Sequence, residues 1–139
     1  MSEPLYPEFG GQCSRETAIQ VVHADGSLSL EMIVESVARG QRDGGEVTSI
    51  VCRDKYYPLR VTVFYKTYPD CDVIETWTEI SHTEKKAVRL ERFASVCLPV
   101  RRADNYLTHF HGAWGSEACL YEELLTGGSK VISNKDGVR

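Results

Sequence analysis

The residue types best suited to chemistry gather in one short segment, Leu107–Glu117, which holds two of the chain's four histidines and one of its two tryptophans. On an extended strand His109 and His111 project from the same face, because side chains alternate with a period of two. Two imidazoles so placed are able to bind a metal ion. No neighbouring cysteine or third histidine completes a ligand set, and Glu117 lies beyond two flexible glycines. The sequence therefore predicts no metal site.

Trp114 is the second candidate in this segment. Its neighbours Ala113 and Gly115 are small and leave the indole ring accessible. A flat apolar ring with a single N–H donor suits stacking against the C–H surface of a sugar. The residue composition alone leaves open that Trp114 packs in a core or at an interface. Trp77, which lies between two threonines in a strand pattern, is expected in the core.

Other catalytic patterns are missing from the sequence. It has no Gly-x-Ser-x-Gly elbow, no phosphate loop and no dinucleotide fingerprint, so no cofactor is expected. Hydrolysis of a glycosidic bond needs two carboxyl groups facing the bond from opposite sides. Glu75 and Glu79 lie instead on one expected strand, about 13 Å apart, and are interpreted as a solvated strand face. No catalytic residue is predicted.

Composition and charge exclude several classes of protein. The 139 residues are 42% hydrophobic and 26% charged, which is typical of a soluble globular domain. No apolar run approaches the roughly 20 residues of a membrane-spanning helix, and the first five residues lack the pattern of a secretory signal. The 16 basic and 20 acidic residues give a net charge of −4, with the basic ones scattered. We therefore expect neither nucleic acid nor a membrane as a partner.

The cysteines carry little functional signal. There are five of them, with no Cys-x-x-Cys spacing, which argues against a disulfide framework or a zinc site. They are interpreted as small buried apolar side chains, and Cys97 fits this best because it lies in the apolar stretch Ala94–Pro99.

Period-two alternation recurs along the chain, whereas helical apolar repeats are scarce, so the sequence predicts an all-β fold. A short helix remains an alternative within Leu28–Val37, where the apolar residues do not alternate cleanly. The loops expected between strands include Ala24–Ser27 and Gly40–Gly45. The expected strands are Thr17–His23, Leu28–Val37, Glu46–Arg53, Leu59–Tyr68, Asp72–His82, Ala87–Leu98, Tyr106–Trp114 and Glu117–Leu125.

Two pairings are expected among these strands. Leu59–Tyr68, Asp72–His82 and Ala87–Leu98 are joined by short polar turns and predict a three-stranded meander. Glu117–Leu125 is expected to pair with Lys130–Ser133. Antiparallel runs without alternating long helices indicate an antiparallel β-sandwich.

Several motifs, in order along the chain, carry a resemblance to a known family. The two most specific are Tyr-Pro-Glu-Phe-Gly at Tyr6–Gly10 and the His-Gly-Ala-Trp segment at His111–Trp114. Between them lie weaker matches at Ala24–Gly26, Val61–Tyr65, Asp72–Ile74 and Val88–Arg92. From Tyr6 to Arg139 the chain resembles the N-terminal domain of bacterial α-galactosidases of glycoside hydrolase family 36.

The resemblance implies a large β-sandwich of supersandwich type, of which this chain is a part. In that family the sandwich precedes a (β/α)₈ barrel, and two aspartates of the barrel release terminal α-D-galactose with retention. The barrel is absent here, which agrees with the lack of catalytic residues. Residues 1–5 are assigned to the start of the chain or a linker, and residues 6–139 to the partial sandwich domain. Resemblance to bacterial enzymes leaves the cytoplasm and the periplasm both open.

The resemblance also implies partners and a site. Family members are usually tetramers, in which the N-terminal domain of one subunit borders the active site of its neighbour. The expected partners are therefore the protein's own catalytic barrel, neighbouring subunits of a homo-oligomer and an α-galactoside. The tryptophan of the family's Gly-Ala-Trp motif lies at the shared site, which assigns substrate binding to Trp114, Gly112 and His111.

Two other functions remain open. In the first, the chain is a free-standing carbohydrate-binding module with Trp114, Tyr106 and His111 as its platform. In the second, it is a purely structural domain, and Trp114 is buried in an oligomer interface.

Overall fold

The computed structural model describes residues 6–8, 10, 16–98, 104–127 and 130–133. All regular elements within these ranges are strands, which confirms the predicted all-β class and the antiparallel sheets. The part of the chain described contains no helix that is long and apolar enough to cross a membrane. The strands are β1 (Ile19–Val22), β2 (Met32–Arg42), β3 (Gly45–Asp54), β4 (Leu59–Tyr68), β5 (Val73–His82), β6 (Arg89–Phe93), β7 (Tyr106–Ala113) and β8 (Ser116–Leu124).

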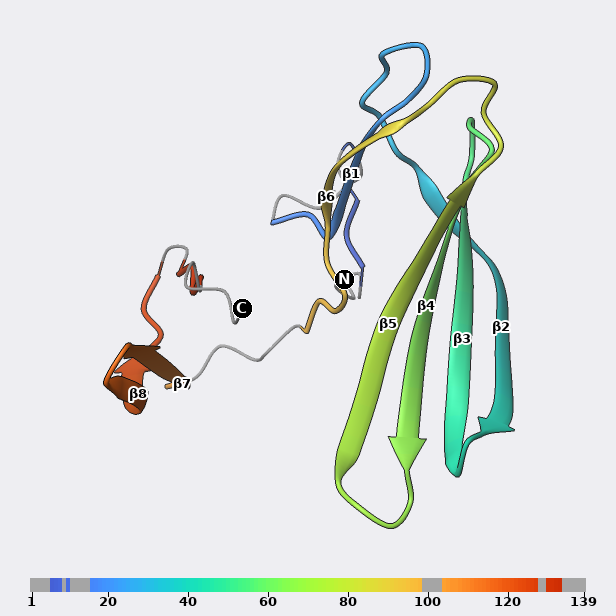
Figure 1. The fold of residues 1–139 in the computed structure, drawn as a ribbon. Coiled ribbons are helices and arrows are strands. Elements are labelled where there is room, and N and C mark those ends of the chain that lie inside the picture. The colour runs from blue at the N-terminus through green and yellow to red at the C-terminus, as the bar shows by residue number, and fades with distance from the viewer. Residues whose placement is uncertain (1–5, 9, 11–15, 99–103, 128–129, 134–139) are drawn as a thin grey trace. The chain divides into compact units, whose positions relative to one another are not determined.

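The chain divides into two compact units, Met1–Pro99 and Val100–Arg139, each described by itself. In the first unit, β2, β3, β4 and β5 form an antiparallel meander in that order (Figure 1). Asp43 and Gly44 both have positive φ, 48° and 77°, and make the two-residue turn between β2 and β3. The loop predicted at Gly40–Gly45 is thus shorter than expected, since only Asp43 and Gly44 lie between the two strands. The short helix considered within Leu28–Val37 is not formed, because β2 begins at Met32.

The predicted three-stranded meander is wrong in its last strand. β6 does not extend the sheet beside β5 but pairs with β1, so that Ile19 lies opposite Phe93 and Val22 opposite Arg89. The physical reason lies in the polar link after β5. Glu84 in this link is hydrogen-bonded to His23 and to the backbone of Ala24, which draws the chain towards the end of β1.

The core of the first unit lies between the two sheets. Alternate residues of β1 and of β4 contribute to one cluster, as period-two alternation predicts for strands with one face against a core. The two-stranded sheet β1–β6 and the meander β2–β5 are therefore the layers of the predicted sandwich. The buried hydrophobic residues of the cluster are Ile19, Val21, Leu30, Leu59, Val61 and Val63.

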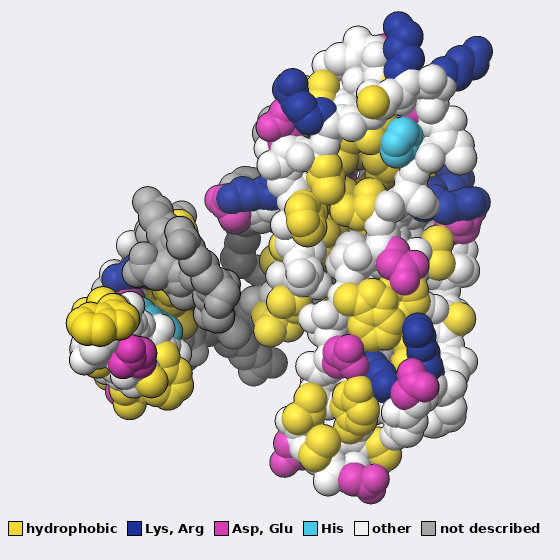
Figure 2. Space-filling model, in the orientation of Figure 1, with side chains coloured by type: hydrophobic (Ala, Val, Ile, Leu, Met, Phe, Trp, Pro, Cys, Tyr) yellow, Lys and Arg dark blue, Asp and Glu magenta, His cyan; other side chains and the backbone are white. Residues whose placement is uncertain are grey.

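The core covers only part of the larger sheet. Figure 2 shows hydrophobic side chains in patches between charged ones over β2–β5. Trp77, predicted in the core, is only half-buried, and its ring stacks on Phe64 with centroids 4.6 Å apart. The cysteines are also less buried than predicted. Cys71 is exposed, Cys97 is half-buried, as are two others, and Cys13 lies outside the described residues.

The second unit contains one antiparallel hairpin, β7–β8. The predicted pairing of Glu117–Leu125 with Lys130–Ser133 is wrong, because β8 pairs with β7 and residues 130–133 lie outside the strands. A tight turn at Trp114–Gly115 explains the difference. Gly115 has a φ of 79°, which a glycine adopts without strain, so the chain reverses directly after the tryptophan.

Candidate functional site

The tip of the β7–β8 hairpin presents Trp114 to solvent. The side chain is at the turn between the two strands and is 99% exposed. The turn is fixed next to it, since the backbone N–H of Gly115 donates a hydrogen bond to Glu117 Oε1 over 3.1 Å. An indole ring held on a tight turn is available on both of its flat faces. This is the geometry that stacking on a sugar or insertion into a partner requires.

Gly112 positions this tip. A Cβ atom at residue 112 would lie 2.9 Å from Glu117 Cα and 2.9 Å from Ser116 O, which is too close for any side chain. The strand register shifts between His111 and Ala113, and Ala118 opposite has a φ of 54°, so the two strands approach closely at a bulge. Gly112 is therefore needed for the close approach of the two strands. Its contact with substrate remains a prediction.

The two faces of the hairpin differ in chemistry. We call one the histidine face and the other the apolar face, as the register of β7 and β8 assigns them. On the histidine face the ring centroids of His109 and His111 are 6.3 Å apart, which confirms that these two side chains share a face. The histidine face consists of Leu107, His109, His111, Cys119, Tyr121 and Glu123, and the apolar face of Tyr106, Thr108, Phe110, Leu120, Glu122 and Leu124.

The apolar face is open to solvent in this structure. Phe110 lies directly opposite Leu120, and their side chains are 68% and 63% exposed. Tyr106 and Leu124 repeat the pattern at the base of the hairpin. No residue among those described in the second unit is buried. A lone two-stranded hairpin is marginally stable in water, and large exposed apolar patches are typical of surfaces that contact other protein.

Two polar atoms of the histidine face have no partner. Among the described residues, the buried side-chain atoms without a hydrogen bond are His109 Nδ1, Glu123 Oε1 and His23 Nε2. The first two belong to this one face. Glu123 is paired with Lys130 through its other carboxylate oxygen, so only one of its two oxygens lacks a partner.

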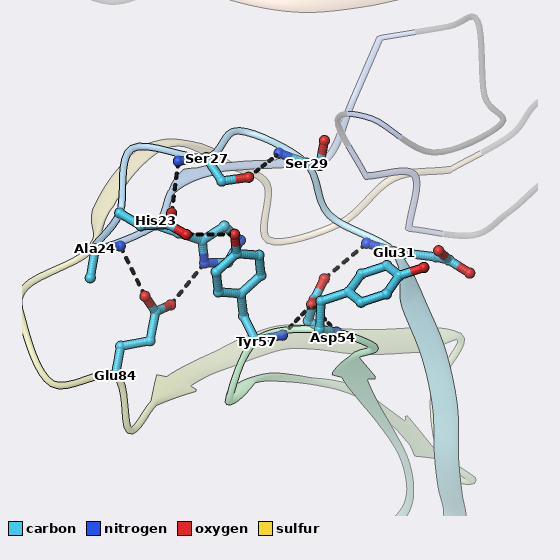
Figure 3. Close-up of polar contacts among 10 residues, drawn as sticks. His23, Ala24, Ser27, Ser29, Glu31, Asp54, Tyr57 and Glu84 are labelled. Carbon is cyan, nitrogen blue, oxygen red and sulfur yellow. Dashed lines mark hydrogen bonds and ion pairs between the residues drawn. The ribbon is translucent and has the colours of Figure 1, made fainter.

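A second polar cluster lies in the first unit and joins three distant segments (Figure 3). His23 Nδ1 donates to Glu84 Oε1 over 2.8 Å, and the backbone N–H of Ala24 donates to Glu84 Oε2 over 2.9 Å. The ring of Tyr57 stacks on the ring of His23, with centroids 3.6 Å apart. The Tyr57 hydroxyl group donates a hydrogen bond to Asp25 Oδ2 over 2.9 Å. Residues 23, 57 and 84 are far apart in the sequence, so no local spacing could have signalled the cluster.

Asp54 organises the loop beside this cluster. One of its oxygens accepts hydrogen bonds from the backbone N–H groups of Tyr56 and Tyr57, both at 2.7 Å, and the other accepts from Glu31 at 2.8 Å. The carboxylate is buried and fully used by the backbone. Asp54 therefore shapes the turn between β3 and β4.

The electrostatics of the cluster also indicate a structural role. Burial acts to raise the pKa of the Glu84 carboxyl, but hydrogen bonds from His23 and Ala24 outweigh it and hold the pKa below its ordinary value. A shallow cleft of about 380 Å³ adjoins the turn. Two of its three Lys and Arg side chains, Lys55 and Arg60, are paired with Glu31 and Glu35, and Arg53 also lines the cleft. The cluster thus links the end of β1 to the segments that follow β3 and β5. Its one buried side-chain atom without a hydrogen-bond partner among the described residues is His23 Nε2.

Comparison with known proteins identifies the family of the chain and structures that are similar to it. The model of the glycosyl hydrolase family 36 N-terminal domain matches residues 2–139. The structure is similar to the α-galactosidase AgaB of Geobacillus stearothermophilus, with a TM-score of 0.77 and 26% identity over 88% of this chain. It also matches the α-galactosidase of Lactobacillus brevis, with a TM-score of 0.81 and 24% identity over 89% of this chain. The chain spans 19% of the length of each. No curated protein sequence matches it.

Proposed function

The chain belongs to the glycosyl hydrolase family 36 N-terminal domain family, and from that premise we propose that it is the non-catalytic N-terminal domain of a retaining α-galactosidase. The similar structures at 26% identity are α-galactosidases, and the chain corresponds to only 19% of their length. Such an enzyme removes terminal α-D-galactose. Relatives in complex with raffinose and with stachyose support an oligosaccharide substrate of that class.

The catalytic groups then lie outside this chain. Retaining glycosidases hold two carboxyl groups about 5 Å apart across the bond that breaks. Glu75 and Glu79 do not meet this requirement, since they lie on one strand and are both exposed, as the sequence predicted. The expected partner is a catalytic barrel domain of the same protein.

The observation that carries the proposed role of the domain is the fully exposed Trp114 at the tip of a hairpin with one apolar face. We assign the apolar face to a contact with protein, in a homo-oligomer, and the tip to the rim of a neighbouring subunit's active site. Trp114 stacks on the sugar there and His111 offers a ring nitrogen to a hydroxyl group. Gly112 lets the strands approach closely enough to form the tip. A tetramer, as the family resemblance implies, provides such a neighbour.

The geometry of the hairpin argues against a free-standing carbohydrate-binding module. Tyr106 begins β7 and Trp114 follows its end, so the two residues are about 26 Å apart along the strand. Tyr106 also belongs to the apolar face and His111 to the histidine face. The three side chains do not form one platform for a sugar ring.

The test compares the purified chain with the full-length enzyme that contains it. The chain alone should hydrolyse no aryl α-galactoside and should bind no glycan on an array, whereas the full-length enzyme should turn over the same substrate. Turnover by the isolated chain would overturn the non-catalytic assignment. Specific glycan binding by the isolated chain would favour the module instead.

A further inference from the structure

Three rings of the histidine face form a compact cluster, which we call the ring triangle: His109, His111 and Tyr121. The ring centroids of the two histidines are 6.3 Å apart, and the Tyr121 centroid lies 5.3 Å from that of His109 and 6.2 Å from that of His111. The ring planes meet at 54° to 67°, and tilted or edge contacts of this kind between aromatic rings are favourable. The register supplies the third ring, since it places Tyr121 directly opposite His109.

The ring triangle lies beside the tip of the hairpin. His111 and Cys119 form the last regular pair before the bulge, and Trp114 comes three residues after His111. The pair of His109 and Tyr121 is one step further from the tip, about 7 Å along the strands. A ligand that touches Trp114 and continues along the histidine face therefore meets the ring triangle next.

The ring triangle has polar atoms that the protein does not engage. Tyr121 is 47% exposed, His111 is exposed and His109 is half-buried. Within the described residues no hydrogen bond joins these three side chains to other groups. His109 Nδ1 is a buried atom without a partner, so Nε2 is the nitrogen of this ring that remains for a ligand. Because an imidazole and a phenol both donate and accept hydrogen bonds, the ring triangle suits a ligand with hydroxyl groups.

The charges on the histidine face are already paired. Glu123 is the one carboxylate of this face, and it forms an ion pair with Lys130. Cys119 contacts Ser116, and no three His, Cys, Asp or Glu side chains among the described residues are grouped to hold a metal ion. A charged ligand thus finds no free carboxylate, lysine or arginine among the residues of this face. Rings beside unengaged polar atoms suit a neutral sugar, which has apolar C–H faces and hydroxyl groups.

We propose that the ring triangle binds the second sugar residue of an oligosaccharide with terminal α-galactose. This inference rests on the proposed α-galactosidase function and specifies its substrate class, because it predicts a preference for oligosaccharides over galactosides without a second sugar. The Tyr121 ring packs against the C–H face of that sugar, and the two histidines form hydrogen bonds with its hydroxyl groups. The contact lies away from the bond that breaks, so it stabilises the ground state and the transition state equally and acts on KM and not on kcat.

Steady-state kinetics of the full-length enzyme with two substrates test this. The first substrate is α-galactosyl fluoride, which has no second sugar, and the second is a trisaccharide with terminal α-galactose. Tyr121→Ala should raise KM for the trisaccharide by about 3- to 10-fold, as expected for the loss of one aromatic contact, and should leave its kcat unchanged. Both constants for the fluoride should stay at the wild-type values.

Further variants keep the test specific. Tyr121→Phe retains the ring and should raise KM for the trisaccharide less than Tyr121→Ala does. His109→Ala should change the trisaccharide KM alone, whereas Trp114→Ala should lower kcat/KM for both substrates. Tyr56→Ala is the matched control, because Tyr56 is an exposed tyrosine of the first unit, and it should change neither substrate.

The outcomes separate this inference from the function on which it rests. An unchanged KM for the trisaccharide in both Tyr121→Ala and His109→Ala would overturn the ring triangle as a sugar site while the α-galactosidase assignment stands. Equal losses on both substrates in Tyr121→Ala would also overturn it, because Tyr121 would then support the tip without binding a sugar. A full-length enzyme that hydrolyses neither substrate would overturn both proposals.

Discussion

We call the region around β1 and β4 the core end of the first unit. It and the β7–β8 hairpin are both antiparallel β structure, but they differ in how far their apolar side chains are buried. Around β1 and β4 the apolar residues are buried, and Asp54 and Glu84 have hydrogen bonds to both carboxylate oxygens. In the hairpin the large apolar side chains of one face are exposed, and two polar atoms of the other lack partners.

This difference separates residues that are buried in the fold from residues that we propose make contacts. Among the described residues of the first unit, His23 Nε2 is the one buried side-chain nitrogen or oxygen atom without a hydrogen-bond partner, and the other buried polar groups are satisfied within the unit. The hairpin holds Trp114, Phe110 and Leu120 in water, a cost that native domains accept where a partner or ligand later covers the surface. The comparison therefore predicts that substitutions in the first region change stability and that those in the second change binding.

The largest expected difference in the free energy of unfolding is between alanine variants of two leucines, one from each region. Leu59→Ala should lower the free energy of unfolding by about 2–5 kcal/mol, because Leu59 is 1% exposed and its loss leaves a cavity. Leu120→Ala should change it by no more than about 0.5 kcal/mol, because Leu120 is 63% exposed. Urea unfolding of both variants measures this. Equal losses would erase the distinction between the two regions.

The next prediction concerns the carboxylate of Asp54, which accepts hydrogen bonds from backbone N–H groups. Asp54→Ala should cost about 2–3 kcal/mol, since three backbone N–H groups lose their acceptor at a buried position. Asp70→Ala, in the exposed turn between β4 and β5, is the control and should be close to neutral. The same urea titration applies. A neutral Asp54→Ala would show that water replaces the carboxylate and that the turn holds itself.

A pH experiment tests the link between Glu84 and His23. The pKa of the Glu84 carboxyl lies below its ordinary value of 4.5 in the folded protein. The ionised carboxylate therefore stabilises the fold above that pH, and this contribution is lost as the pH falls further. The free energy of unfolding should fall less steeply below pH 4.5 in Glu84→Gln than in the wild type. Parallel pH profiles would contradict the assignment.

Gly112→Ala should act on the hairpin alone. The added methyl group clashes with the backbone of Ser116 and Glu117, so hydrogen exchange at the amides of β7 and β8 should accelerate, by an amount that corresponds to about 1 kcal/mol. Protection in β4 should not change. Gly40→Ala is the matched control, because no atom lies within 4 Å of its added Cβ. Slower exchange in the hairpin would contradict the steric account.

Much of the fold was predictable from local pattern. Period-two alternation predicted the strand Leu59–Tyr68 with the bounds that β4 has, and the His-x-His spacing correctly placed both rings on one face. The partner of β6 was not predictable, because it depends on the long-range bond between Glu84 and His23. The pairing of β7 with β8 has a local signal in the glycine after Trp114, which the sequence interpretation did not use for that hairpin.

Some features of the candidate site were also predictable from the sequence, and others were not. The exposure of Trp114 was predictable from its small neighbours, since a tryptophan between alanine and glycine has little to pack against. The position of Cys119 opposite His111 was not, because it follows from register and a bulge and not from spacing along one strand. The bonds from Ala24 to Glu84 and from Glu31 to Asp54 were invisible for a similar reason, as they join separate segments, whereas the bonds from Tyr56 and Tyr57 to Asp54 are local.

The most direct test of the account is the steady-state kinetics of the full-length enzyme with Trp114→Ala. We predict that kcat/KM for an α-galactoside falls by about tenfold or more, as expected for the loss of an aromatic stacking contact worth roughly 1.5 kcal/mol. The unfolding midpoint of the isolated chain should remain that of the wild type, because the side chain is 99% exposed. Unchanged kinetics with normal assembly, or a destabilised isolated chain, would contradict the assignment of Trp114 to a neighbouring active site.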